Sequence, residues 1–402
     1  MNGDGAGLPF TIFEQETEST YQTRPREWGM TLHWGSSHLT SCLPPSLIER
    51  LSEAYADPSL SPDAVTGLPI YNGKTGELLM EMKADKPCRV SRKKLRNLFA
   101  DGLDISYGME VDSIRQVNDG KVVCVFTDGT EAKGDIVVGC DGAKSRVREQ
   151  ICGKEKAMLT EVPLSMFNFT AKFEADLAKY IRGRNALFVT SIHPDTGIMF
   201  WLSIQDVPDP SRPETWTFQV LLSWVNNPLP PSEDTYAGRL AFLKARASEW
   251  AEPWRSAGLS LPPDTKIPND KGTYWEKAAK WDNRSGRMTL CGDAAHPMTP
   301  HRGQGLNNAL QDASNFVAVV TEAAKGDVGL AEAMDGYDKE VLERGSLEMK
   351  ISLRQTMFIH NWETLMQSPM VKMGMHQAKK DDVGKENGSE GTRATRAEEV
   401  AT

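Results

Sequence analysis

The sequence predicts a mixed α/β fold in which an antiparallel sheet separates two α/β parts and helices follow toward the C-terminal end. Short apolar runs at residues 135–140 and 287–291 each lead into a Gly/Asp turn and then into helical periodicity, the order typical of a parallel sheet. Between them lie four long, aromatic-rich segments of alternating polarity, which favour antiparallel strands. From residue 304 onward, apolar residues recur at helical spacing.

Residues 1–160 are predicted as the first α/β part. The segment Leu8–Glu16 is a short apolar strand that ends in acidic residues. The run Arg92–Ala100 is a helix, because Leu95, Leu98 and Phe99 share one face. Turns rich in Asn, Asp and Gly separate three further strands. Besides the strand at 8–16 and the helix at 92–100, we expect a helix at 45–56, a hairpin around Asn72-Gly73, and strands at 109–117, 121–127 and 135–140.

Residues 161–270 are predicted as the inserted sheet, and residues 271–360 as the second α/β part with the C-terminal helices. Residues 377–402 are polar, charged and without periodicity, so we expect a disordered tail. The expected elements are strands at 164–173, 186–193, 198–205, 215–224 and 287–291, and helices at 233–250, 304–324 and 330–344.

Composition excludes several classes of protein. The net charge of −9 argues against nucleic acid as a partner, because phosphate binding needs a basic surface. Six cysteines without a C-x-x-C pair indicate a reduced intracellular protein rather than a disulfide framework or a zinc site. The absence of a signal peptide and of a long apolar run predicts a cytoplasmic protein with no membrane span. The oligomeric state is not predicted.

The stretch LCGDAAHPMTPHRGQGLNNALQDA, residues 290–313, contains an unusual amount of special backbone between a strand and a helix. Asp293 follows the strand, where its carboxylate can accept hydrogen bonds from sugar-like hydroxyls. Pro300 stiffens the turn, and Gly303 and Gly305 remove side chains where a flat ligand must approach. The helix that follows can stabilise an anion at its N-terminus. A loop that merely turns the chain does not need this fixed order of residues.

A second stretch, DIVVGCDGAKSRVREQI at residues 135–151, has a related layout. A strand ends at Asp141-Gly142, and Ser145 and Arg148 open a helical run. Spacing alone is equally consistent with an ordinary strand–turn–helix whose serine caps the helix.

The two stretches together resemble the GD and DG motifs of class A flavoprotein monooxygenases, the para-hydroxybenzoate hydroxylase-like family. The order M-T-P-H-R-G-Q-G-L-N-N resembles a branch common in fungal secondary metabolism. The resemblance implies a Rossmann-like FAD-binding domain with an inserted substrate-binding sheet. It assigns to FAD the ribityl contact of Asp293, the ring contacts of Pro300, Gly303 and Gly305, and the helix-start amides of Leu306 and Asn307. The DG motif residues Asp141 and Gly142 would border both FAD and the approach of NAD(P)H.

The same resemblance suggests three further cofactor contacts. Glu14 ends the strand FTIFE, where the family binds the adenosine ribose, although a terminal Glu is commonly just a solvated charge. Arg92 opens a helix that resembles the one carrying the FAD-contacting arginine of the family, and it could equally be a surface residue. Arg26, in RPREWGM, lies where family members pass near the flavin.

The family pattern is interrupted at the N-terminus. Gly3, Gly5 and Gly7 alternate, but no apolar strand precedes them and no helix follows, so the G-x-G-x-x-G setting is missing. We expect the first βα unit, and with it the pyrophosphate cradle, to be absent.

The function implied by the resemblance is an FAD-dependent monooxygenase that uses NAD(P)H and O₂. In that family a flavin C4a-hydroperoxide would hydroxylate or epoxidise a small organic substrate held under the sheet. We name no side-chain catalyst. His296 and His301 are candidate bases, but a His beside a cofactor loop is more often a structural hydrogen-bonding residue. Trp201, Trp216 and Trp224 fit an apolar substrate pocket or a plain sheet core. The alternatives are a non-oxidative flavoprotein relative, such as an isomerase or cyclase, and an inactive truncated homologue.

Overall fold

The structure is a computed structural model that describes residues 7–24, 26–83, 86–368 and 371. Its largest sheet has seven strands in the order β15-β11-β14-β13-β12-β3-β4. The four central strands pair antiparallel, as their alternating polarity predicts. They are β11 (Thr160–Lys172), β12 (Phe188–Ile192), β13 (Met199–Asp206) and β14 (Thr217–Val225).

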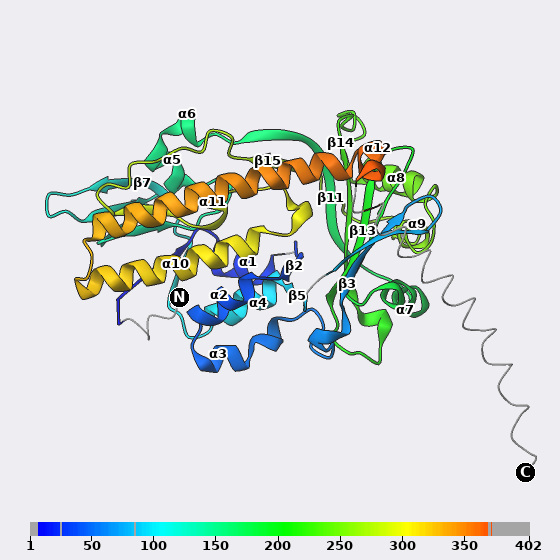
Figure 1. Cartoon of the computed structure of the whole chain (residues 1–402), viewed down its shortest axis with the longest axis horizontal. Coiled ribbons are helices and arrows are strands. Elements are labelled where there is room, and N and C mark those ends of the chain that lie inside the picture. The colour runs from blue at the N-terminus through cyan, green and yellow to red at the C-terminus, as the bar shows by residue number, and fades with distance from the viewer. Residues whose placement is uncertain (1–6, 25, 84–85, 369–370, 372–402) are drawn as a thin grey trace, which may run out of the picture.

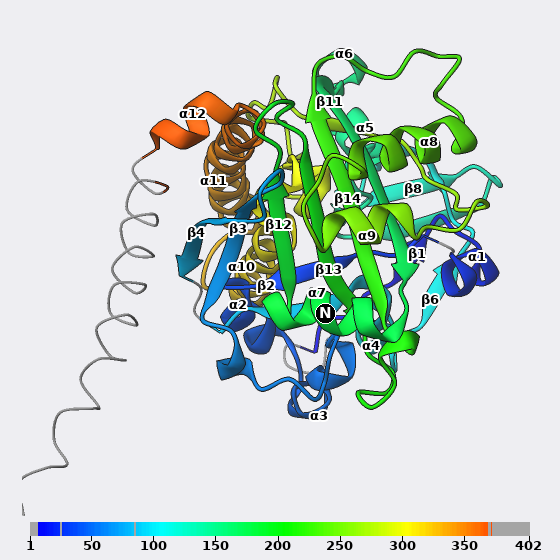
Figure 2. The ribbon, with the colours of Figure 1, turned by 90° about the vertical axis from the view of Figure 1, so that its right-hand side faces the viewer.

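One face of this sheet is covered by helices, as Figure 2 shows. Phe200, Phe218 and Leu222 point to that face and are fully buried in the main apolar core. Because successive side chains of a strand alternate between faces, Trp201 and Gln219 point to the opposite face, toward the rest of the molecule. The covering helices are α7 (Ala175–Arg184), α8 (Tyr236–Ala247) and α9 (Trp254–Leu259).

Strands from outside residues 161–270 extend the sheet at both edges. The hairpin expected around Asn72-Gly73 is present as β3 (Gly67–Asn72) and β4 (Leu78–Lys83). Strand β3 pairs parallel with β12, a long-range contact that periodicity does not reveal. At the other edge β15 (Asp270–Tyr274) pairs with β11.

The parallel strands form two separate pairs. Strand β1 (Ile12–Glu14) pairs with β6 (Ile105–Tyr107), and β10 (Val137–Gly139) pairs with β16 (Met288–Leu290). Among the residues that the structure describes, no strand is hydrogen-bonded to both pairs. Residues 1–6 lie outside the described part, so the expectation about the first βα unit stays a prediction.

Two long C-terminal helices run side by side along the molecule (Figure 1). The first, α10 (Gly305–Lys325), matches the expected 304–324. The second, α11 (Leu330–Ile359), continues well beyond the expected end at Arg344, and its last turns reach the large sheet through Ile359. The predicted tail at 377–402 lies outside the described residues.

A small antiparallel pair lies between the large sheet and two helices of the N-terminal part (Figure 1). It consists of β2 (Gly29–Leu32) and β5 (Cys88–Ser91), with α2 (Gly35–Cys42) and the expected helix α4 (Arg92–Ala100) on one side. The other elements are α1 (Glu18–Thr23), α3 (Pro45–Glu49), β7 (Val111–Gln116), β8 (Val122–Phe126), β9 (Glu131–Gly134), α5 (Arg146–Cys152), α6 (Lys154–Ala157) and α12 (Trp362–Gln367). Within the described ranges, no helix is both long enough and apolar enough to span a membrane.

Asp338 of α11 provides a test of how α11 is held against β16. It is buried and accepts hydrogen bonds from Thr289 and from Asn283, whose Nδ2 lies 2.8 Å from Oδ2. Burial raises the pKa of Asp338 from 3.8 to about 6. At a pH between 3.8 and about 6, Asp338 is protonated in the folded state and ionised in the unfolded chain. The free energy of unfolding therefore falls as the pH rises through this range, by about 3 kcal/mol in total. We expect Asp338→Asn to remove this part of the pH dependence.

The measurement is urea unfolding of wild type and variant at several pH values from 4 to 7. The stability of the wild type should fall relative to that of the variant as the pH rises across this range. A constant difference between the two would contradict the assignment.

Candidate functional site

The pairing of β10 with β16 brings the two Gly/Asp turns together. In their register Gly139 lies opposite Leu290, and the amide of Cys291 donates to the carbonyl of Gly139 (2.9 Å). Because the strands are parallel, the chain leaves both at the same end of the pair. The turns that contain Asp141 and Asp293 are therefore neighbours in space.

The carboxylate of Asp141 caps helix α5. It accepts hydrogen bonds from the amides of Arg146 (2.6 Å) and Val147 (3.1 Å) and from the Ser145 hydroxyl. Ser145 itself caps the amide of Arg148 (2.9 Å). Gly142 has φ +77°, and a Cβ there would meet nothing within 4 Å. The turn therefore offers an open backbone surface at Gly142, while the Asp141 oxygens are already used by the helix.

Arg148 joins the two turns. Its side chain is buried, stacks on Trp275 and donates hydrogen bonds to three backbone carbonyls. The acceptors are Ala143 in the first turn (2.5 Å), Ala294 in the second (2.8 Å) and Ala157 beyond α5 (3.1 Å). This arginine of the DG motif therefore crosslinks the two turns through their backbone carbonyls.

Asp293 has a carboxylate that no described residue hydrogen-bonds. Its Oδ1 lies over the start of α10, at 3.7 Å from where a Cβ on Gly305 would be. The side chain is open to solvent, yet the surrounding protein desolvates it, and this raises the pKa of Asp293; the nearby His296 and Arg92 act in the opposite direction. The structure thus brings Asp293, Gly305 and the charge of Arg92 to one place.

The loop before α10 is exposed at Gly303, while Gly305 and Leu306 are half-buried and Asn307 is buried. Pro300 begins a short 3₁₀ turn, and Gly303 follows with φ +63° and nothing within 4 Å of its would-be Cβ. The first amides of α10, at Gly305, Leu306 and Asn307, have no partner within the helix. The Asn307 side chain is not free, since its Oδ1 accepts from the amides of His33 (2.9 Å) and Gly35 (3.1 Å) and its Nδ2 donates to Thr31.

The three other predicted cofactor residues have different surroundings. Arg92 stacks on Trp28, with the guanidinium carbon 4.7 Å from the ring centroid, and forms no ion pair with a described residue. Glu14 ends β1 as expected, and its Oε1 accepts from the amide of Glu16 (2.9 Å). Arg26 forms a two-pronged ion pair with Asp270 of β15 (2.9 and 2.5 Å), so its charge is already matched at the surface.

Comparisons with known proteins show the family to which the chain belongs. A family described as FAD binding domain matches residues 61–350. The FAD-dependent monooxygenase cctM of Talaromyces islandicus is 34% identical over 92% of this chain and 92% of its own length. The chain belongs to the FAD-dependent monooxygenases. A second relative, phnB of Penicillium herquei, is 35% identical over 95% of this chain and 92% of its own length.

Solved structures show the same fold for this monooxygenase. Klebsiella pneumoniae HpxO complexed with FAD and uric acid has a TM-score of 0.69 at 17% identity, over 93% of this chain and 87% of that one. CtdE in complex with FAD and a substrate has a TM-score of 0.73 at 15% identity, over 92% of this chain and 88% of that one. The mixed fold predicted from the sequence is confirmed.

The two histidines of the GD stretch have structural partners in the monooxygenase. His296 is fully buried, and its Nε2 lies 2.7 Å from Asp312, which also pairs with Arg344. His301 lies between Ser223 of β14 (Nε2–Oγ 3.1 Å) and Thr356 of α11 (Nδ1–Oγ1 2.9 Å). The sequence analysis missed three residues of this network, Ser223, Thr356 and His360. The Nε2 of His360 also contacts Ser223 (3.0 Å).

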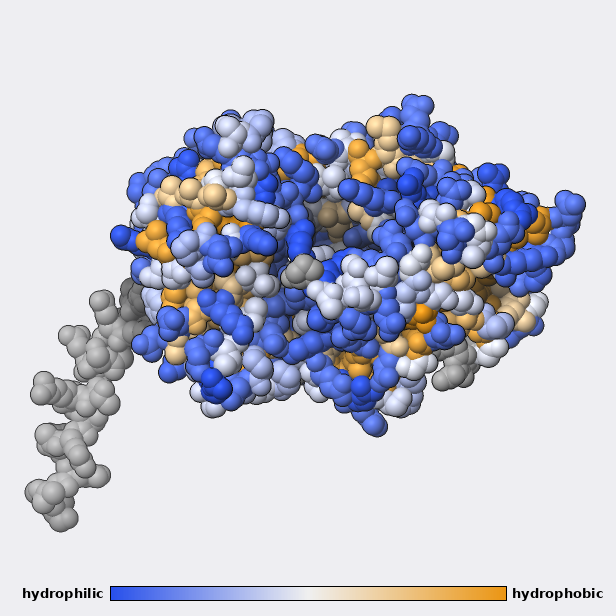
Figure 3. Space-filling view, turned by 180° about the vertical axis from the view of Figure 1, so that it is seen from behind, coloured by the Kyte–Doolittle hydropathy of each residue, from blue (hydrophilic) through white to orange (hydrophobic). Residues whose placement is uncertain are grey.

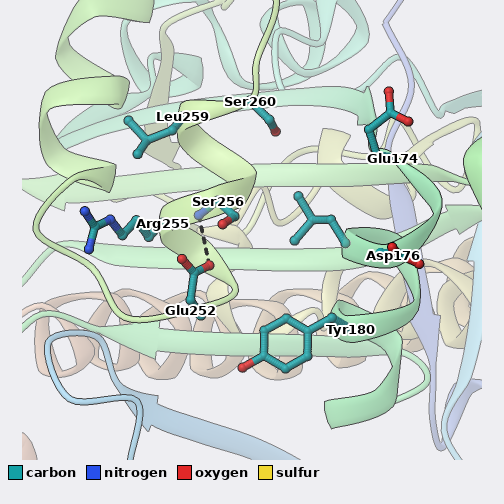
Figure 4. A pocket seen from close by; sticks show the side chains of 9 residues that line it. Glu174, Asp176, Tyr180, Glu252, Arg255, Ser256, Leu259 and Ser260 are labelled. Atoms are coloured by element: carbon teal, nitrogen blue, oxygen red, sulfur yellow. Dashed lines mark hydrogen bonds between the residues drawn. The ribbon is translucent and has the colours of Figure 1, made fainter.

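Two hollows at the surface of the monooxygenase differ in their position. Figure 3 shows one near the middle of the face seen from behind. Figure 4 shows a shallow one between α7 and α9, lined among others by Tyr180, Glu252 and Arg255, with Glu252 accepting from the amide of Ser256 (3.1 Å). The second hollow lies on the helix-covered face of the sheet, away from the Gly/Asp turns.

Arg148 should be important for stability. Replacement by Leu leaves three buried carbonyls without their charged donor, so we expect Arg148→Leu to lower the free energy of unfolding by about 3 kcal/mol or more. The exposed neighbour Arg146 gives the matched control, and Arg146→Leu should change stability by less than about 1 kcal/mol. Urea unfolding measures both, and equal effects would contradict the assigned role.

Proposed function

We propose that this chain binds FAD across the two Gly/Asp turns and the start of α10. With NAD(P)H and O₂ it then hydroxylates or epoxidises a small organic molecule of secondary metabolism, held against the uncovered face of the large sheet. The observation that carries the proposal is the Asp293 carboxylate, which no described residue hydrogen-bonds and which lies over Gly305 at the N-terminus of a 21-residue helix.

The residues present fit this cofactor. Asp293 would accept hydrogen bonds from ribityl hydroxyls, as its free oxygens allow. Gly303 and Gly305 would permit close approach of a flat ring, with Pro300 beside it. The amides of Leu306 and Asn307 would stabilise negative charge on the pyrimidine edge. On the adenosine side the candidate is Glu14, and Arg92 and the open backbone at Gly142 are further candidate contacts of FAD.

When bound, FAD supplies the electron transfer and oxygen activation that the protein side chains lack. The chain supplies position and shielding. His301, held by Ser223 and Thr356, fixes the loop that follows Pro300 against the sheet. On the sheet face opposite α7, α8 and α9, an apolar cluster that includes Met199, Leu221 and Ile359 keeps water away.

Oxygen uptake tests the reaction class. The chain, reconstituted with FAD, should consume O₂ when NADPH or NADH is added, and protein without flavin should not. Flavin-loaded protein that consumes neither O₂ nor either nicotinamide would contradict the monooxygenase proposal and favour the non-oxidative alternative.

Asp293→Asn separates binding from stability. An amide cannot accept as strongly as a carboxylate, so we expect FAD affinity to fall about tenfold to a hundredfold. Because desolvation by the surrounding protein raises the pKa of Asp293, the ionised form costs stability at neutral pH. The flavin-free variant should therefore be more stable than wild type at pH 7, and this gain should vanish below the ordinary value of 3.8.

The matched control is Asp327→Asn, which removes the same charge just beyond the other end of α10. It should leave the flavin affinity unchanged. An Asp293→Asn variant that binds FAD as tightly as wild type would show that this carboxylate is not a cofactor contact.

A further inference from the structure

Two cysteines lie side by side where the Gly/Asp turns begin. Cys140 directly follows β10 and Cys291 directly follows β16, one residue beyond the last register pair of these strands, Gly139 with Leu290. The backbone at Cys291 stays extended (φ −141°, ψ 142°), and its amide donates to the carbonyl of Gly139 (2.9 Å). The parallel pairing therefore makes neighbours of Cys140 and Cys291, although they are far apart in the sequence.

The two side chains point to the same face of the strand pair. A Cβ on Gly139 would lie 2.6 Å from the Cβ of Val147, so that row faces α5. Because side chains alternate along a strand, the next row faces the opposite side, where the Cys291 Sγ lies 4.0 Å from the carbonyl oxygen of Ala309 in α10. On that side the thiols of Cys140 and Cys291 are hydrogen-bonded to each other.

The spacing of the two residues suits a disulfide. Neighbouring strands of a sheet lie about 4.8 Å apart. A disulfide joins Cα atoms that are roughly 4.4–6.8 Å apart, provided that the two side chains do not point away from each other. The β10–β16 pairing and the hydrogen bonds of Arg148 to both turns already hold this spacing, so the bond could form without a rearrangement of the backbone.

The two thiols differ in their exposure and acidity. Cys140 is exposed, whereas Cys291 is half-buried. The hydrogen bond with Cys291 lowers the pKa of the Cys140 thiol, although burial and the carboxylate of Asp141 act in the opposite direction. The same hydrogen bond and burial raise the pKa of Cys291. Cys140 therefore ionises first and Cys291 lies next to it as a second thiol, an arrangement typical of redox-sensing cysteines.

The other four cysteines have different surroundings. Burial raises the pKa of Cys88 and of Cys152 to about 11, and it also raises the pKa of Cys124. These three thiols are therefore less reactive than an ordinary cysteine. Cys42 of α2 is half-buried beside the Ser41 hydroxyl (3.9 Å) and provides a control whose exposure is similar to that of Cys291.

We propose that Cys140 and Cys291 form a reversible disulfide when the protein meets hydrogen peroxide. The Cys140 thiolate attacks one peroxide oxygen: an S–O bond forms, the O–O bond breaks, and the hydroxide that leaves takes up a proton to become water. The Cys291 sulfur then attacks the sulfenic acid, so that an S–S bond replaces the S–O bond and a second water leaves with the proton of the Cys291 thiol. Two thiols are thereby oxidised to one disulfide, and the peroxide is reduced to water.

The disulfide adds a covalent link between the two turns to the hydrogen bonds that Arg148 makes with both of them. Because it closes a long loop, it also restricts the unfolded chain. We therefore expect the oxidised protein to unfold at a higher urea concentration than the reduced protein. Neither a flavin nor the proposed reaction takes part in this step.

The test treats the purified chain with hydrogen peroxide, blocks the remaining thiols with iodoacetamide and measures masses. Wild type should lose the mass of two hydrogen atoms, and trypsin should release residues 134–144 linked to residues 288–302. Dithiothreitol should restore both thiols. A chain that is unfolded in urea before the treatment should lose the preference for this pair, because only the fold brings the two cysteines together.

Three variants assign the roles of the thiols. In Cys291→Ser, Cys140 should stop at the sulfenic acid, which dimedone labels. In Cys140→Ser, Cys291 should react with peroxide at least about tenfold more slowly than Cys140 does in wild type. Cys42→Ser is the matched control, and it should form the disulfide as wild type does.

The proposal is wrong if peroxide oxidises Cys140 of wild type to a sulfinic acid without a link to Cys291. It is also wrong if Cys140 pairs with another cysteine or with a second copy of the chain. A Cys140 thiol that reacts no faster than Cys42 would equally overturn it.

Discussion

The parallel pairing of β10 with β16 is the constraint on which the site depends. Each strand has only three residues, and each ends at a Gly or Leu that is followed by a turn carrying an aspartate. Their pairing makes neighbours of two turns that are far apart in the sequence. Arg148 then crosslinks the turns through three backbone carbonyls, which restricts the backbone of both where we propose that the cofactor binds.

The second half of the site is positioned by contacts that cross from one layer to another. Asn307 ties the start of α10 to β2 and α2, and His301 ties the preceding loop to β14 and α11. These contacts are neutral hydrogen bonds, and each is satisfied at both ends. By contrast, Asp293 carries a charge that no described partner compensates. Charged side chains without a partner are expected where a ligand binds, although they lower the stability of the ligand-free protein.

Local patterns in the sequence predicted the two Gly/Asp turns and the strands and helices that flank them, but not β2 and α2, which hold the start of α10. They were not enough to show what each side chain does, since that depends on partners distant in sequence. Asp141 was assigned to the cofactor, but its oxygens cap α5; Arg26 was assigned to the flavin, but it pairs with Asp270. Both assignments stay predictions.

Other features had no local signal at all. Cys140 and Cys291 lie far apart in the sequence, and their proximity is visible only once β10 pairs with β16. The same holds for Ser223 and His360, which meet only because α11 extends past Arg344 to the sheet. The addition of β3 to β12 likewise joins residues separated by more than a hundred positions.

The most direct test of the account is the visible absorption spectrum of the purified chain after incubation with FAD and gel filtration. The account predicts flavin bands that co-elute with the protein in equimolar amount. Folded protein that elutes without colour would contradict it, because the turns, the glycines and the start of α10 would then not form a flavin site in this chain.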